Sequence, residues 1–151
     1  YSKNDVNLFS LKDKGNDAGF SGKISLQKKW NQLHVLHKEH EVQLDASMEY
    51  INPNFTSTER IRTVEFYRDW SLGLLVNQEQ ENLSKLSASI RGKQGGALIY
   101  DASRFIRGKD YAGVKQGLSQ ELKLFSFNIK YQLQHTQIDK EFLKGYFLST
   151  K

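Results

Sequence analysis

The sequence predicts an all-β protein, an antiparallel meander of about eight long strands that forms either a membrane-type β-barrel or a β-sandwich. Two observations predict this fold. Apolar and polar residues alternate with a period of two along most of the chain, as on strands with one apolar and one polar face. Segments rich in glycine, asparagine and aspartate separate these stretches and indicate turns. Long two-faced strands joined in sequence are typical of antiparallel sheets.

The alternation and the turns place the expected strands at residues 5–13, 19–30, 33–51, 60–76, 82–92, 96–106, 111–135 and 141–149. The clearest alternation runs from Phe125 to Leu133, where every odd position is apolar or aromatic. The parity changes just before Phe125, which predicts a β-bulge inside the strand at 111–135. Residues 33–42 and 77–86 would also fit short helices, but we expect strands around a polar turn in both places.

Alternation alone leaves the membrane barrel and the soluble sandwich or barrel open, because each needs one apolar and one polar face. A membrane strand needs about 9–11 residues, and the stretches at 60–76 and 111–135 are longer. Length therefore favours the membrane barrel. Arg68 shares the apolar parity of its stretch and counts against it, since a charge facing lipid at the midplane costs on the order of 2–4 kcal/mol.

The composition fits one β domain over residues 1–151 and excludes several function classes. The chain has no cysteine, which excludes a disulfide scaffold, a thiolate zinc site and a cysteine nucleophile. It contains no apolar run of the length that a transmembrane helix needs. The 22 basic and 17 acidic residues give a net charge of +5. The basic residues are scattered along the chain, so we expect no nucleic-acid partner.

Aromatic residues toward the ends of the expected strands are the candidate interface residues: Trp30, Tyr50, Trp70, Tyr100 and Tyr111. In a membrane barrel they would form the interfacial girdles. In a soluble protein they would be core residues or a carbohydrate-stacking surface.

The tetrapeptide IRGK occurs at 90–93 and again at 106–109. Its basic residues are the candidate contacts to anionic lipid headgroups: Arg91, Lys93, Arg107 and Lys109.

The sequence predicts no catalytic, cofactor or metal site. His34, His37 and His40 are the closest approach to a metal-binding motif. On a strand, however, His37 points away from the other two, which lie roughly 20 Å apart. The carboxylates of Glu65 and Asp69 would lie about 13 Å apart on one strand, too far for paired-acid catalysis. We therefore expect a protein that is not an enzyme and has no small-molecule substrate.

Three segments resemble the large, mostly uncharacterised β-rich cell-envelope proteins of Bacteroidota. They are EYINPNFTSTERIRTVEFYRDW (49–70), ALIYDASRFIRGKDYAGVKQGL (97–118) and EFLKGYFLSTK (141–151). The resemblance extends over residues 42–151 and leaves 1–41 uncovered. It implies an outer-membrane or cell-surface location, a piece of a longer chain, and a structural or transport-associated role without catalytic residues. The implied partners are a lipid bilayer or other envelope chains. The alternative is a soluble β-sandwich module that binds a glycan or a protein.

Overall fold

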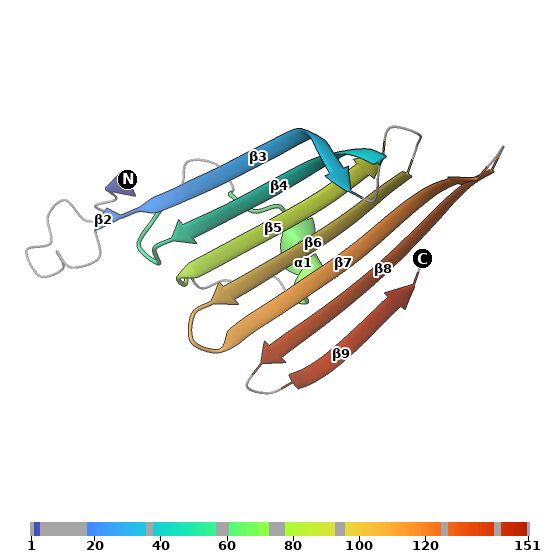
Figure 1. The fold of residues 1–151 in the computed structure, drawn as a ribbon. Coiled ribbons are helices and arrows are strands. Elements are labelled where there is room, and N and C mark those ends of the chain that lie inside the picture. Colours follow the sequence, from blue (N-terminus) through green and yellow to red (C-terminus); the bar gives the residue numbers. More distant parts are fainter. Residues whose placement is uncertain are drawn as a thin grey trace, which may run out of the picture.

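The computed structural model describes residues 2–3, 18–35, 38–56, 61–72, 78–92, 96–124, 127–140 and 143–150. Seven of the strands form one antiparallel sheet in chain order, so each strand pairs with the next one along the sequence (Figure 1). These strands are β3 (Ser21–Val35), β4 (Lys38–Ile51), β5 (Glu81–Gly92), β6 (Gly96–Arg107), β7 (Tyr111–Leu124), β8 (Phe127–Lys140) and β9 (Leu143–Thr150). Two short strands, β1 (Ser2–Lys3) and β2 (Ala18–Gly19), pair separately.

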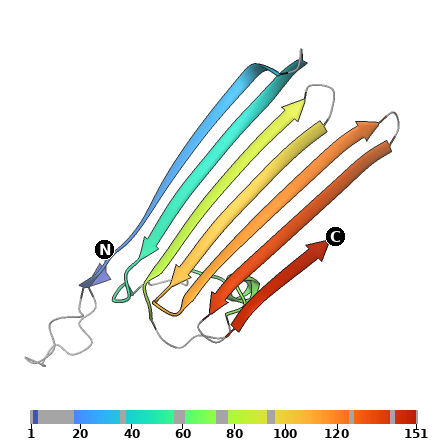
Figure 2. The ribbon, with the colours of Figure 1, turned by 60° about the horizontal axis from the view of Figure 1, so that its bottom comes forward.

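The prediction of an all-β antiparallel meander is confirmed. The large sheet is open, because its edge strands β3 and β9 do not pair with each other (Figure 2). Its strands also agree with the predicted turns at 92–96 and 107–110: β5 ends at Gly92, and Gly108–Asp110 form the turn into β7. The expected strand at 5–13 lies outside the described residues.

The expected strands at 19–30, 33–51 and 111–135 have other bounds in the structure. The chain reverses between Val35 and Lys38, so 33–51 contains the end of β3 and all of β4. The break that we expected after Trp30 is a register shift between Trp30 and Leu33 within β3. Residues 111–135 contain β7 and the first part of β8, paired antiparallel. The parity change there marks a chain reversal rather than a bulge.

The expected strand at 60–76 is wrong, because residues Val64–Asp69 form the short helix α1. Thr63 is its N-cap: its side-chain oxygen accepts a hydrogen bond of 3.2 Å from the backbone N–H of Phe66. Phe66 and Trp70 are four residues apart, a spacing that suits a helix face as well as a strand face. A helix of six residues is marginal by itself, so α1 depends on what it packs against.

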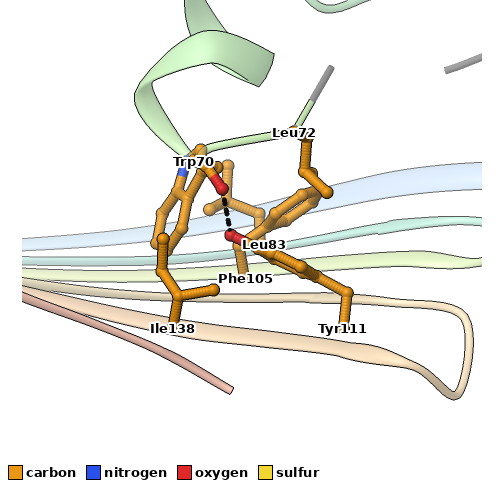
Figure 3. Close-up of a cluster of buried hydrophobic side chains, with 6 residues drawn as sticks. All are labelled: Trp70, Leu72, Leu83, Phe105, Tyr111 and Ile138. Atoms are coloured by element: carbon orange, nitrogen blue, oxygen red, sulfur yellow. Dashed lines mark hydrogen bonds between the residues drawn. The ribbon is translucent and has the colours of Figure 1, made fainter. Parts of the chain in front are cut away.

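That packing surface is one face of the large sheet, at the end where β6 leads into β7 (Figures 1 and 2). The buried core lies between this end of the sheet and the segment that contains α1 (Figure 3). Its buried members are Trp70, Leu72, Leu83, Phe105, Tyr111 and Ile138, with Phe66 and Tyr67 packed against them. The rest of the sheet has no such cover within the part of the chain that the structure describes.

Replacing Phe105 with alanine tests this core. Phe105 has no exposed surface, whereas Phe127 on β8 is 74% exposed. We expect Phe105→Ala to lower the free energy of unfolding by about 3–5 kcal/mol. The matched Phe127→Ala should change it by about 0.5 kcal/mol or less, as an exposed site allows. Urea unfolding followed by circular dichroism, under the same conditions for both variants, measures the difference. Equal losses would contradict the placement of the core.

Candidate functional site

The pairing register assigns the side chains of the large sheet to two faces of opposite character, because directly paired residues point to the same side. One face, here called the polar face, carries α1 at one end. Two successive rows of paired residues show its composition beyond α1. They are Ser25, Ser47, Lys85, Ser103, Lys115 and Thr136, and then Gln27, Asp45, Ser87, Asp101, Gly117 and Gln134.

These rows are polar or glycine across all six strands from β3 to β8. All of these residues except Thr136 line a hollow of about 670 Å³ on the polar face. Such a surface is suited to contact with water rather than to burial against a second sheet.

The opposite face, here called the apolar face, exposes large hydrophobic side chains. Ile24 and Leu26 on β3 are each 70% exposed, and Met48 on β4 is 55% exposed. Other exposed members are Leu44, Leu86, Ile90, Leu98, Tyr100, Leu118, Leu122, Phe127, Ile129 and Tyr131. A contiguous apolar surface across six strands far exceeds the scattered exposed hydrophobics of an ordinary soluble surface.

The apolar residues form a band that crosses the strands obliquely. The row through Leu26 continues as Ala46, Leu86 and Ala102, and then turns polar at Gln116 and His135. On the far side of the sheet, Ile129 pairs with Leu122 at the other end of these strands. The apolar stretch therefore shifts along the strands as the sheet is crossed from β3 to β8.

The register gives the angle of this band. On β4 the apolar run extends from Val42 to Tyr50 and is centred at Ala46. The row of Ala46 meets β8 at His135, about five residues from the centre of the apolar run on β8 near 130. Five residues along a strand are about 17 Å, and four strand spacings are about 19 Å. The rows of paired residues run perpendicular to the strands, and the band makes an angle of roughly 40° with them. If the band lies parallel to a membrane plane, this angle equals the tilt of the strands, which is about 35–45° in membrane barrels.

Polar side chains border the band on both sides. Lys28 on β3 and His40 on β4 lie at its margin on the side toward the end of the sheet farther from α1. Ser84, Arg104 and Gln137 border it on the α1 side, in the row that begins with Ile24 and Met48. Arg104 thus lies at the margin of the band rather than at its centre.

The polar face changes character under residues 61–72, here called the docked segment. Beneath it, Leu83, Phe105 and Ile138 replace the serines and glutamines of the neighbouring rows. The rings of Phe66 and Trp70 lie 5.1 and 5.4 Å from that of Phe105. The hydroxyl of Tyr111 donates a hydrogen bond of 2.5 Å to the backbone oxygen of Trp70 (Figure 3). Ring packing and a buried hydrogen bond together fix the segment on the sheet.

A buried charge cluster also holds the docked segment. Arg62, with an 8% exposed side chain, forms ion pairs with Glu49 on β4 at 2.7 Å and with Glu81 on β5 at 3.2 Å. Arg107 on β6 contacts Glu79 and Glu81, each at 3.4 Å. The Glu81 carboxylate thus lies between two buried guanidinium groups. Such a cluster fixes the position of the segment, since separating one partner would leave a buried charge without compensation.

Burial changes the pKa values of side chains around the docked segment. Burial raises the pKa of Tyr111 above its ordinary value. The pKa of Tyr67 is also raised, first by burial and then by the carboxylate of Glu81, to which its hydroxyl donates a hydrogen bond of 3.2 Å. Burial lowers the pKa of Lys115, partly offset by Asp69, while its ammonium group lies 4.6 Å from the centre of the Trp70 ring system. The neutral forms are favoured because burial removes water from the charged forms.

The five candidate aromatics lie on different faces. Trp30 and Tyr50 lie toward opposite ends of the apolar face, and Tyr100 is 38% exposed on the same face. Trp70 and Tyr111 are instead buried together in the core on the polar face. The structure therefore joins two of the five in a core and places the other three on the apolar face.

The candidate headgroup contacts lie at opposite ends of the sheet. Arg91 is exposed at the end of β5, and Lys109 is exposed in the turn between β6 and β7. Lys93 lies outside the described residues. Arg107 is 7% exposed and ion-paired on the polar face, so its guanidinium group is buried rather than open to the headgroup contact that we expected.

The histidine motif forms no cluster in what the structure describes. His40 lies on the apolar face of β4, residue 34 pairs with Glu39 near the end of β3, and His37 is outside the described residues. Across the described ranges, no three His, Asp or Glu side chains are grouped to hold a metal ion. No helix in these ranges has the length and apolar character to cross a membrane.

The sequence analysis predicted neither the charge cluster around Glu81 nor the packing of the docked segment on the sheet. The Thr63 N-cap was a readable signal for α1, together with the four-residue spacing of Phe66 and Trp70. The ion pairs had no local signal, since their members come from β4, the docked segment, β5 and β6. Comparisons with protein-family models, curated proteins and solved structures found no match for this chain.

Replacing Glu81 with glutamine tests the charge cluster. It removes the carboxylate shared by Arg62 and Arg107, so we expect the free energy of unfolding to fall by about 3–5 kcal/mol. The control is Glu121→Gln, whose ion pair with Lys130 is about half exposed and should contribute about 0.5 kcal/mol or less. Denaturant titration of both variants measures these losses. A small loss for Glu81→Gln would show that the cluster does not stabilise the docked segment.

Alkaline titration tests the burial of the two tyrosines. Their folded pKa values are raised, so their contribution to stability is complete below the ordinary pKa of 10.0 and is lost as pH rises through the raised values. We expect ultraviolet absorbance of tyrosinate to show a late-titrating fraction among the seven tyrosines. Tyr111→Phe should remove part of it. A single titration of all tyrosines near pH 10 would contradict this expectation.

Proposed function

We propose that this chain is part of the wall of a membrane β-barrel, a structural or transport-associated β-sheet of a bacterial outer membrane or cell surface, without enzymatic activity. The single observation that carries the proposal is the oblique apolar band. Strands in a membrane barrel are tilted, so the part of each strand that contacts lipid shifts steadily from strand to strand. An apolar band at roughly 40° to the row direction has the geometry that this tilt requires.

Strand lengths and side-chain exposure support the same proposal. The apolar run from Val42 to Tyr50 covers nine residues, at the lower end of the 9–11 that a tilted membrane strand needs. Its side chains include the exposed Leu44 and Met48. Lipid would cover this face, while the polar rows of the other face would line a water-filled interior.

Polar residues at the margins of the band fit the lipid headgroup regions. Arg104 and Lys28 border opposite sides of the band, where a charge costs little. Trp30 and Tyr50 lie near the two margins, the positions of aromatic girdles in membrane barrels.

A complete wall needs more strands than this sheet contains, since its edges β3 and β9 are open. Other envelope chains or further copies of the sheet would supply them. The other candidate function is a soluble β-sandwich module for a glycan or protein partner, in which a second sheet would cover the apolar face. The exposed hydrophobic side chains fit that function as well, but the polar rows through Gln116, His135 and Gln137 would then be buried in the sandwich core.

The two tryptophans provide the test, because Trp30 lies on the apolar face and Trp70 on the polar face. Trp70→Phe leaves only Trp30, and Trp30→Phe leaves only Trp70. Each variant is reconstituted into phosphatidylcholine vesicles with and without brominated acyl chains, and circular dichroism verifies the β-structure. We expect bromine to quench the fluorescence of Trp30 strongly, most of all when the bromine atoms are placed near the headgroup end of the acyl chain. The fluorescence of Trp70 should be almost unquenched.

Equal quenching of both tryptophans would contradict the two-faced placement in the bilayer. A folded monomer that stays in water without detergent, with Trp30 unquenched in the presence of vesicles, would favour the sandwich module instead.

A further inference from the structure

We infer that the docked segment, residues 61–72, is a fixed constriction inside the space that the polar face encloses: it narrows the path of polar solutes at the α1 end of the sheet. This inference rests on the proposed function, in which the polar face borders water. It adds a role for the β4–β5 connection that the wall itself does not require.

The position of the segment is the first argument. The connection between β6 and β7 is a tight turn at Gly108–Asp110, too short to fold over the polar face. In the connection between β4 and β5, the docked segment instead lies over the polar face (Figures 1 and 2). Helices and loops that fold inward in this way are how membrane barrels restrict their interior.

The attachment of the segment is the second argument. A connection that only joined two strands would not need its own core and a buried ion cluster. Here Arg62 reaches carboxylates on both β4 and β5, and the backbone of Trp70 is hydrogen-bonded from β7 by Tyr111. Phe105 on β6 packs against the rings of Phe66 and Trp70, so four strands, β4, β5, β6 and β7, hold one short segment. Such multiple attachment favours a fixed constriction over a mobile lid.

Gly113 on β7 gives the third argument, because the strand has no side chain where Trp70 docks. A Cβ atom at Gly113 would lie 2.9 Å from two carbon atoms of the Trp70 ring and from the Tyr111 hydroxyl. A larger residue there would displace Trp70, although β-branched residues are otherwise favoured in strands. The glycine therefore permits the close approach of the segment to the sheet.

Gly117 offers a matched control on the same strand and face. A Cβ atom there would have its nearest neighbours at 3.9 and 4.0 Å, ordinary contact distances. Gly113→Val and Gly117→Val thus add the same side chain to β7, but only the first should undock the segment. In a Trp30→Phe background, we expect Gly113→Val to shift Trp70 emission to the red and to increase its quenching by acrylamide, with no such change in Gly117→Val.

The functional test uses the full chain in phosphatidylcholine vesicles and the influx of a small neutral sugar, measured by vesicle swelling. We expect influx severalfold faster for Gly113→Val than for the unmodified chain, and unchanged or slower influx for Gly117→Val. Equal influx in all three, with Trp70 undocked in Gly113→Val, would overturn the constriction.

The bromine quenching of Trp30 separates this inference from the proposed function. If Trp30 is quenched but undocking leaves influx unchanged, the membrane wall stands and the constriction is wrong. If Trp30 is not quenched in the vesicles, both are wrong.

Discussion

The structure depends on the residue-by-residue pairing of successive antiparallel strands. Backbone hydrogen bonding fixes which side chains share a face, and a slip by one residue would exchange the two faces of a strand. Because β3 to β8 keep one register across the middle of the sheet, serine, glutamine and lysine side chains gather on one face and leucine and isoleucine on the other. The sheet therefore has two different surfaces before any partner is considered.

The core of this protein is small and lies at one end of the sheet. The apolar face, where most of the large hydrophobic side chains lie, contributes nothing to it. Burial under the docked segment instead joins Phe105 and Trp70 to the charge cluster around Glu81. In water alone, the exposed hydrophobic band would favour association or aggregation. Lipid contact over that band would complete the burial that the protein itself leaves unfinished.

Much of this arrangement was readable from the sequence, because period two directly reports which side chains share a face. The alternation from Phe125 to Leu133 and the turn after Gly92 gave the fold class and several strand ends. The prediction from alternation failed at Val64–Asp69, because the apolar spacing there suits a strand and a helix equally. The Thr63 cap and packing on Phe105 favour the helix. It also missed the reversal after Leu124, since a tight chain reversal and a bulge both change parity. The oblique band could be recognised only from the pairing register between strands, which the alternation along a single strand does not determine.

The tilt of the strands relative to a bilayer tests the central claim most directly. Polarised infrared spectroscopy of the chain in oriented phosphatidylcholine bilayers measures this angle from the dichroism of the amide bands. We expect ordered β-strands tilted by roughly 40° from the bilayer normal, as the band angle requires. Strands without net orientation, or a chain that stays outside the bilayer with its β-structure intact, would contradict the claim that the apolar band faces lipid.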